Sequence, residues 1–387
     1  MNNKLVAKDV DQWLDEVDYS LINSTEYVPS SFALQYINFI KLVNANNPEA
    51  NKSPAMHLTM LDKIVGKSEY LVNLCFRGSA KTTLFMEYLT LFLAVFHEIP
   101  GFGEVEGMIY VADSMENGAK NARKNIETRY ENSEFLQHWV PEAKFTDTYL
   151  EFTNKSGQRL GVKLYGATTG VRGTKIFAKR PVLAVLDDLL TDESAKSKTV
   201  MNLIEDIVYK GINHALDPTR RKVIFCGTPF DKNDILIKAV ESGAWEVNVY
   251  PVCEKFPCKP EEFRGAWEDR FSYDFVKKQY DMAVKTGTTA AFYQELMLRI
   301  SSDDERLVQD DEIRWYQRKS LLKNKHNFNF YITTDFATSA KQTADFSVIS
   351  VWAYNSNGDW FWVDGVCEKQ TMDKNVNDLF RLVLEYK

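Results

Sequence analysis

The stretch EYLVNLCFRGSAKTT, residues 69–83, decides the fold that we expect for this chain. Its first half, from Tyr70 to Cys75, is short, apolar and rich in β-prone residues, which predicts a buried strand. Gly78 to Thr83 then opens a helix whose first turns, Leu84 to Phe96, are mostly apolar. A strand that turns sharply into a helix directs several backbone N–H groups and the positive end of the helix dipole at one point, which suits a phosphate chain.

The same loop matches the general phosphate-binding pattern in spacing but not in every letter. We expect Lys81 to reach the β- and γ-phosphates, Thr82 to bind Mg²⁺ through its hydroxyl, and Gly78 to let the loop bend. The pattern G-x-x-x-x-G-K-[ST] requires glycine at the two positions where this chain has Cys75 and Ala80. Taken alone, the stretch is equally well read as an ordinary strand, turn and helix with a surface lysine.

Composition sets the broad class of the protein. The chain has 387 residues, 44% of them apolar and 26% charged, which is ordinary for a globular protein of two or three domains. It contains no uncharged apolar run of about eighteen residues, so we expect no membrane contact and a cytoplasmic location. The five scattered cysteines fit a reducing compartment, and Cys253 and Cys258 are expected to be plain thiols. The net charge of −7 argues against a protein coated in nucleic acid but permits a local basic groove.

The segments around the loop predict alternating strands and helices. A second buried strand is expected from Gly107 to Ser114, and a polar helix from Glu116 to Tyr130. This alternation predicts parallel strands with helices on both faces, with ligands at the carboxyl ends of the strands. Earlier in the chain, short helices are expected over Val10 to Tyr19 and Ser31 to Val43. Another is expected from Ser53 to Val65, with His57 on its face rather than in catalysis.

Two later strands carry the residues that a nucleotide site needs. Pro181 to Asp188 is an apolar strand that ends in two acids, the form of a Walker B element. Burying adjacent acids is costly unless a cation compensates, so we expect Asp187 to hold Mg²⁺ and Asp188 to orient the attacking water. Arg221 to Pro229 is a buried strand after which the Thr228 hydroxyl can sense the γ-phosphate. The loop, the acids and this strand together favour a nucleotide site.

A glycine-rich segment lies just before the paired acids. Leu160 to Arg180 contains four glycines, and Arg172 stands between Val171 and Gly173. This composition predicts a mobile loop that presents a guanidinium. A hairpin with a solvated arginine is an equally good alternative.

Taken together, these segments resemble the large terminase subunit of tailed bacteriophages, an ATPase that pumps double-stranded DNA into a procapsid and cuts it. The matching segments are Phe76 to Thr82, Gly170 to Gly173, Arg180 to Asp188, and Cys226 to Pro229. Terminase loops commonly depart from the strict glycine pattern and carry an arginine where this chain has Arg77. Ala80 and Asp188 depart from the family, which more often has glycine and glutamate at these positions.

The resemblance implies an ATP- and Mg²⁺-dependent motor. Arg77 or Arg172 would stabilise the transferred phosphoryl group, and Thr228 would couple hydrolysis to motion. The ATP-binding residues would be Arg77, Gly78, Ser79, Ala80, Lys81, Thr82 and Thr83. The implied partners are double-stranded DNA, a small terminase subunit, the portal and procapsid, and further copies of the chain in a ring. The protein would act in the host cytoplasm and transiently at the portal, outside the mature virion.

The C-terminal part resembles the start of an RNase H-like nuclease. Phe292 to Leu296 and the polar stretch to about Asn324 resemble the segment that joins the two terminase domains. Strands are expected from Asn327 to Thr334, Phe346 to Tyr354 and Trp360 to Val366, followed by a helix from Met372 to Tyr386. By this resemblance Asp335 and Asp345 would bind the nuclease metal, Mg²⁺ or Mn²⁺. Without it, Asp335 is equally well an acid on the surface at the end of a strand.

We therefore expect an α/β protein: a P-loop NTPase domain with a mainly parallel sheet, followed by the start of an RNase H-like domain. The expected divisions are a leader at 1–50, the ATPase domain at 51–300, a linker at 301–325 and an incomplete nuclease domain at 326–387. We expect this chain to be part of a longer or split protein that hydrolyses ATP but cannot cut DNA alone. The alternatives are a helicase-like DNA translocase, and a nonenzymatic assembly protein with a decayed nucleotide site.

Overall fold

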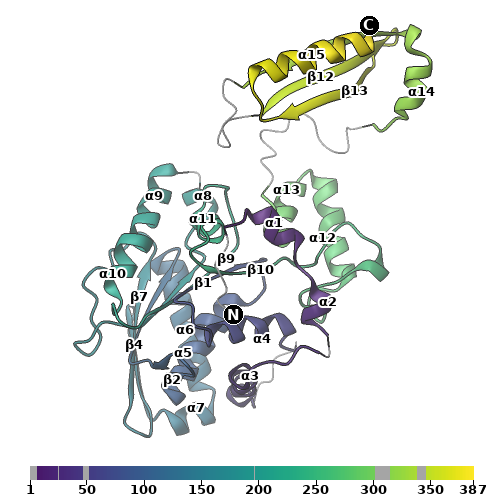
Figure 1. The fold of residues 1–387 in the computed structure, drawn as a ribbon. Coiled ribbons are helices and arrows are strands. Elements are labelled where there is room, and N and C mark those ends of the chain that lie inside the picture. The colour runs from purple at the N-terminus through teal and green to yellow at the C-terminus, as the bar shows by residue number, and fades with distance from the viewer. Residues whose placement is uncertain (1–6, 25, 47–51, 196, 301–313, 338–345) are drawn as a thin grey trace. The chain divides into compact units, whose positions relative to one another are not determined.

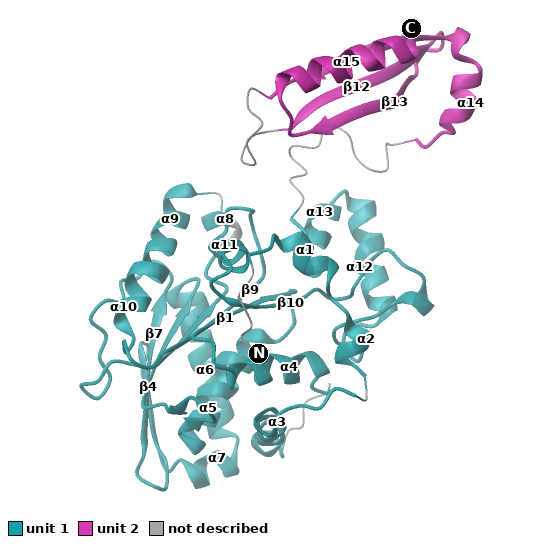
Figure 2. Cartoon of the chain, in the orientation of Figure 1, with its two compact units in different colours: residues 1–303 teal, residues 304–387 magenta. Residues whose placement is uncertain are grey.

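The computed structural model describes residues 7–24, 26–46, 52–195, 197–300, 314–337 and 346–387 (Figure 1). The chain divides into two compact units, residues 1–303 and residues 304–387 (Figure 2). Each unit has its own hydrophobic core.

An eight-stranded sheet forms the centre of the first unit, with strand order β10-β1-β9-β8-β4-β7-β6-β5. The strands are β1 (Tyr70–Cys75), β4 (Gly107–Ala112), β5 (Glu142–Phe145), β6 (Tyr149–Thr153), β7 (Arg159–Gly166), β8 (Leu183–Asp187), β9 (Lys222–Gly227) and β10 (Glu246–Tyr250). The six strands from β10 to β7 in this order pair in parallel, and β6 and β5 add antiparallel pairs at one edge. A separate two-stranded ribbon joins β2 (Glu98–Ile99) to β3 (Gly103–Glu104). The prediction of an α/β fold with a mainly parallel sheet is confirmed.

Helices cover both faces of this sheet. The helices are α1 (Val10–Asp15), α2 (Tyr19–Ile22), α3 (Ser31–Val43), α4 (Ala55–Ile64), α5 (Leu89–Phe96), α6 (Lys120–Glu131), α7 (Glu134–Trp139), α8 (Asp192–Ala195), α9 (Lys198–Asp206), α10 (Asn213–Ala215), α11 (Ile235–Glu241), α12 (Tyr273–Thr286) and α13 (Thr289–Phe292). Four segments have the wider turn of a π-helix: η1 (Thr83–Tyr88), η2 (Met115–Ala119), η3 (Ile207–Ile212) and η5 (Tyr293–Met297). One short segment, η4 (Pro260–Glu262), is a 3₁₀ helix. Figure 1 shows α9 and α11 on one face and α3, α4 and α5 on the other. Among the described residues, no helix is both long and apolar enough to span a bilayer.

The order of the strands determines which loops meet. Strand β9 lies between β1 and β8, and all three run parallel. The segments that leave the carboxyl ends of these strands therefore emerge side by side at the same end of the sheet. These segments are the loop of residues 76–82, the acids at the end of β8, and Thr228.

Strand β7 is where the structure differs most from the sequence expectation. Residues 160–166, expected to belong to a glycine-rich loop, form most of a strand that pairs with β4 and β6, and the loop begins only at Ala167. Leu160, Val162 and Leu164 are buried at alternate positions, as in a strand with one face on a core. Gly161 serves close packing rather than mobility, because a Cβ there would lie 2.4 Å from Ile176 Cγ2.

The first helices pack into the same core as the sheet. Phe92 of α5 lies 5.5, 5.1 and 5.4 Å, between ring centroids, from Phe32, Tyr36 and Phe39 of α3. Helix α3 covers the residues expected from the sequence. Its aromatic face is buried, so the segment expected as a leader is part of the first unit in the structure. The domain divisions at residues 50, 300 and 325 stay predictions.

The second unit is a three-stranded antiparallel sheet with one long helix. The strands, in the order β11-β12-β13, are β11 (Phe328–Asp335), β12 (Ser347–Asn355) and β13 (Trp360–Glu368). Helix α15 (Met372–Tyr386) contributes Leu382 to a core with Ile349 and Val351, while α14 (Arg318–Lys323) and η7 (Lys325–Asn327) precede the sheet. These elements lie close to the expected ranges, but assignment to an RNase H-like nuclease stays a prediction.

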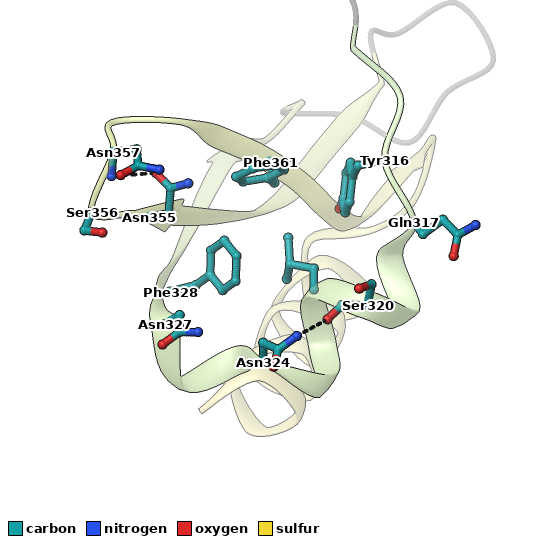
Figure 3. A pocket seen from close by; sticks show the side chains of 11 residues that line it. Tyr316, Gln317, Ser320, Asn324, Asn327, Phe328, Asn355, Ser356, Asn357 and Phe361 are labelled. Carbon is teal, nitrogen blue, oxygen red and sulfur yellow. Dashed lines mark hydrogen bonds between the residues drawn. The ribbon is translucent and has the colours of Figure 1, made fainter.

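A hollow of about 850 Å³ opens in the second unit beside the first residue of β11 (Figure 3). The rings of Phe328 and Phe361 lie in it with centroids 5.6 Å apart, and the Asn324 amide donates to the Ser320 carbonyl at 3.0 Å. It is at the opposite end of β11 from Asp335.

Candidate nucleotide-binding site

The loop of residues 76–82 joins β1 to the turn η1 and is fixed by backbone contacts. The Phe76 N–H donates to the Tyr250 carbonyl at 3.0 Å, and Ser79 is fully buried. Gly78 has φ +91° and Ala80 has φ +63°. Both residues therefore adopt left-handed backbone, which an alanine tolerates at a cost of about 1–2 kcal/mol. The loop has the bend that a glycine would favour at position 80, although the chain supplies alanine.

Lys81 lies inside the molecule rather than on its surface. Its Nζ is 2.9 Å from Asp188 Oδ2 and 3.3 Å from Thr228 Oγ1, and only 7% of its side chain is exposed. Burial lowers the pKa of Lys81, but the charges of Asp188 and Asp187 more than offset this and raise it overall. Lys81 is thus a buried cation at the carboxyl ends of the strands. This position excludes the interpretation of residues 69–83 as a turn with a surface lysine.

Thr228 joins the loop to the paired acids. Its hydroxyl donates to the Cys75 carbonyl at 2.9 Å, and its N–H donates to Asp188 Oδ1 at 3.0 Å. It holds this place because β9 runs between β1 and β8. The residue predicted to sense the phosphate therefore touches the loop strand, the lysine and the second acid at once.

Asp187, the last residue of β8, is a buried carboxylate with an unsatisfied oxygen. Its Oδ2 accepts a hydrogen bond from the Tyr110 hydroxyl at 3.0 Å, while Oδ1 has no hydrogen-bond partner among the described residues. Burial and then the charge of Asp188 raise its pKa to about 6, against the opposing influence of Lys81, Thr82 and Tyr110. A buried carboxylate oxygen without a donor, beside a threonine, fits a hard divalent cation. These are the two residues predicted to hold Mg²⁺.

Asp188 has a different environment. Its side chain is 41% exposed, and its backbone has φ +42°, an uncommon conformation for a residue other than glycine. The Asp188 N–H donates to the Cys226 carbonyl at 3.0 Å, which directs the carboxylate toward Lys81 and Thr228. The two neighbouring acids thus face different partners.

The two candidate arginines lie in separate places. Arg77 is exposed, and its guanidinium forms an ion pair with Glu295 of η5. Arg172 is exposed on the loop that follows β7. The contacts of Lys81, Asp188 and Thr228 described above include neither guanidinium, so the assignment of an arginine finger stays a prediction.

A cavity of about 810 Å³ opens beside the loop. Ala80 and Thr83 line one side of it, and Tyr88, His57 and Trp267 line others. His57 Nε2 lies 2.8 Å from the Ser79 carbonyl oxygen, and the His57 and Trp267 rings are 5.1 Å apart. The sequence analysis placed His57 only on a helix face.

Three residues around the site were missed by the sequence analysis: Tyr110, Glu295 and Trp267. Tyr110 had a signal, since it is the one hydroxyl in the buried strand GMIYVA. Glu295 and Trp267 belong to segments far along the chain, and their local sequence carries no sign of the loop that they approach.

Of the two residues predicted to bind the nuclease metal, Asp335 lies in the described part of the chain. Asp335 is exposed at the end of β11, and Asp345 lies outside the described residues. Over the parts of the chain that the structure describes, no group of three or more His, Cys, Asp or Glu side chains is placed to hold a metal ion.

No protein-family model and no curated protein matches this chain. Among solved structures, it is similar to the large terminase of bacteriophage HK97, with 16% identity and a TM-score of 0.44 over 89% of this chain and 70% of that one. It is also similar to the ATPase domain of the Thermus phage P74-26 large terminase, with 10% identity and a TM-score of 0.44 over 71% of this chain and all of that one. A third similarity is to the Phi-28 gp11 DNA packaging motor, with 9% identity and a TM-score of 0.34 over 80% and 79% of the two chains. At this level of similarity, function has to be inferred from the site residues.

Proposed function

We propose that this chain is a large terminase subunit, an ATPase that drives double-stranded viral DNA into a procapsid. The observation that carries the ATPase proposal is the position of Lys81, buried and bonded to both Asp188 and Thr228. A buried lysine that begins a helix and faces a strand-end acid suits a phosphate chain, which would replace the acid as its partner.

The residues of the site have separate roles in this proposal. Lys81 moves from Asp188 to the β- and γ-phosphates when ATP binds. Asp188 is thereby released and orients the water that attacks the γ-phosphate. Because Thr228 contacts both of them, the change of partner is transmitted to β9 and the segment that follows it.

Asp187 and Thr82 would hold Mg²⁺, which neutralises charge on the β- and γ-phosphates when bound. The unsatisfied Oδ1 of Asp187 supports this role, and Tyr110 fixes the other oxygen. Arg77 or Arg172 would stabilise the transferred phosphoryl group. The remaining loop residues, Gly78, Ser79, Ala80 and Thr83, would surround the phosphates.

The cavity beside the loop has the chemistry for the rest of the nucleotide. Its volume of about 810 Å³ is in the range of small-molecule sites. Trp267 and Tyr88 offer aromatic surface for a base, and His57 links the cavity to the loop through the Ser79 carbonyl.

We include the partners and the nuclease activity in the proposal because the sequence resembles large terminase subunits. The chain would work as a ring with further copies of itself, together with a small terminase subunit and a portal. It would act in the host cytoplasm and at the procapsid. In the complete protein, Asp335 and Asp345 would bind Mg²⁺ or Mn²⁺ for cutting concatemeric DNA.

ATP hydrolysis by the wild-type chain and by Lys81→Ala tests the proposal. Loss of a single charge that stabilises the transferred phosphate is expected to lower turnover about 10²- to 10³-fold. Lys238→Ala, which removes a lysine ion-paired on the surface with Glu205, is the matched control and should keep the wild-type rate. Equal, negligible rates in wild type and Lys81→Ala would instead favour a decayed nucleotide site.

A further inference from the structure

The hollow of about 850 Å³ in the second unit combines aromatic rings with amide side chains (Figure 3). Its walls are helix α14, the start of β11, and the hairpin that joins β12 to β13. None of the described residues that line it is charged. Its volume is in the range of sites that enclose a small molecule or part of a larger one.

Three aromatic rings form the apolar part of the hollow. The Phe361 ring lies edge-on to both of its neighbours, with ring centroids 5.1 Å from Tyr316 and 5.6 Å from Phe328. The Tyr316 hydroxyl donates to the Trp362 carbonyl at 2.7 Å, which fixes that ring. All three side chains are only partly buried, so part of each ring is accessible. Accessible rings of this kind suit a flat aromatic group such as a nucleobase.

The polar part of the hollow consists of amides that are not all used within the fold. Asn355 is occupied by the hairpin turn, because its Nδ2 donates to Asp359 Oδ2 and its Oδ1 accepts from two backbone N–H groups, each at 2.9 Å. In contrast, the side-chain amides of Gln317, Asn327 and Asn357 form no hydrogen bond with another described residue. Each amide offers both donors and an acceptor, as does the edge of a nucleobase.

Basic residues flank this neutral hollow. Residues 314–334 contain five arginine and lysine side chains and no acid, in a chain whose net charge is −7. Arg318 is engaged by an acid of β13, but Lys323 and Lys325 form no ion pair with a described acid. These two exposed lysines stand on either side of Asn324, which lines the hollow. Lysines beside a pocket for a flat group suit the phosphates of a nucleic acid strand.

We propose that the hollow binds an unpaired nucleotide of a single DNA strand. The base stacks on the accessible rings and pairs with the amides, while Lys323 and Lys325 contact the phosphates. A base inside a duplex is stacked and paired, so it has to leave the duplex before it enters. The hollow is at the opposite end of β11 from Asp335, apart from the predicted nuclease residue. The choice of DNA over RNA rests on the proposed function.

Phe361→Leu tests the stacking, because leucine keeps an apolar side chain and removes the ring. The measurement is fluorescence anisotropy of a labelled oligothymidylate of about 16 nucleotides, added to the full chain without ATP. A stacked base changes affinity about five- to 100-fold, so the variant should bind the single strand at least about fivefold more weakly. Its affinity for the same strand paired with its complement should stay unchanged. Phe380→Leu, which alters an exposed ring of α15 outside the hollow, is the matched control and should bind like wild type.

Lys325→Gln tests the phosphate contact through the effect of salt. Each phosphate contact to a single strand adds about 0.7 to the slope of log affinity against log salt concentration. Lys325→Gln should make this slope shallower by about that amount. Lys374→Gln, an exposed lysine of α15 outside the hollow, should keep the wild-type slope. An unchanged slope in Lys325→Gln would overturn the assignment of the phosphates.

A loss of fold is separated from a loss of contact by a second variant. If Phe361→Leu has a lowered Tm, Asn357→Ala on the exposed turn replaces it, and the loss of an amide contact should weaken single-strand binding about two- to tenfold. No single-strand binding by wild type, or equal weakening for single strand and duplex, would overturn the inference. Tighter binding of oligouridylate RNA would overturn the choice of DNA. Because no measurement uses ATP, each of these results leaves the ATPase proposal standing, and an inactive ATPase leaves the binding results unaffected.

Discussion

Asp187 and Asp188 are neighbours in the sequence, yet their surroundings assign them different chemistry. Asp187 is buried, with a pKa raised to about 6 by burial and by Asp188, and one of its oxygens lacks a donor among the described residues. Asp188 is partly exposed and bonded to Lys81. Two carboxylates in unlike environments are a common way to divide cation binding from water activation.

This division predicts different defects for the two acids. Asp187→Ala is expected to lose Mg²⁺-dependent ATP binding, because it removes the buried carboxylate that we propose as the cation ligand. Asp188→Asn is expected to bind ATP within about twofold of wild type and to lose at least about 10²-fold in turnover. Fluorescent-nucleotide binding and steady-state hydrolysis distinguish the two. Loss of binding in both variants would contradict the separate roles.

The raised pKa of Asp187 predicts a pH-dependent need for Mg²⁺. Burial favours the neutral acid, so a proton competes with the cation once the pH falls below about 6. Between pH 7.5 and pH 5.5, the Mg²⁺ concentration for half-maximal hydrolysis should rise about fourfold. Tyr110→Phe removes a hydrogen bond that lowers this pKa, so its transition should begin at higher pH. Tyr130→Phe, which loses a bond to the Val140 carbonyl, should titrate like wild type.

The left-handed backbone of Ala80 predicts that glycine at this position stabilises the folded protein. Its φ of +63° is costly for alanine and free of strain for glycine, although glycine loses more entropy on folding. Ala80→Gly is therefore expected to raise the free energy of unfolding by about 0.5–1 kcal/mol, as measured by urea denaturation. The same change at Ala94, inside helix α5, should lower it by about 1 kcal/mol. A loss of stability at both positions would show that residue 80 is not strained.

At the scale of elements, local pattern predicted much of the fold. Strand β1 and helices α3 and α15 cover the expected residues, because each has a clear apolar period and a defined end. The antiparallel strands β5 and β6 went unpredicted, and β7 was read as a loop because of its glycines. The glycine at position 161 reflects contact with Ile176, which lies outside the strand. Trp267 and Glu295 escaped because tertiary packing alone brings them to the site, whereas Tyr110 had a local signal as the one hydroxyl in its buried strand.

The aromatic contact between α3 and α5 predicts that α3, which precedes the loop of residues 76–82, stabilises α5, which follows that loop. Phe92 is fully buried among Phe32, Tyr36 and Phe39, whereas Phe96 on the same helix is 37% exposed. Phe92→Ala should lower the free energy of unfolding by about 3–5 kcal/mol. Phe96→Ala should cost about 1.5 kcal/mol or less, because less of its surface leaves water. Equal costs in urea denaturation would argue against this packing.

At the scale of the whole molecule, the proposed ring predicts that Arg172 of one copy completes the nucleotide site of a neighbouring copy. Arg172 is exposed on the loop after β7, and the contacts described for Lys81, with Asp188 and Thr228, do not include it. A side chain presented in this way is suited to a neighbouring copy in a ring.

Mixing two inactive variants tests a shared site. Arg172→Ala copies supply an intact Lys81, and Lys81→Ala copies supply an intact Arg172. Random assembly at equal amounts should restore about a quarter of the wild-type sites. The measurement is ATP hydrolysis against mixing ratio, with Lys238→Ala in place of Arg172→Ala as the control. Activity that stays at the level of the separate variants at every ratio would argue against Arg172 acting on a neighbour.

Arg299 fastens the end of the first unit to its beginning through Asp11 and Asp15 of α1. A tensile force applied to the chain from residue 304 would therefore be shared between α1 and η5 before it reached β10, the edge strand against which α1 packs. Exposed ion pairs are worth only about 0–1 kcal/mol each, so this fastening opens and closes easily. Under tension it would yield first and re-form afterwards, while the strands of the sheet stay paired.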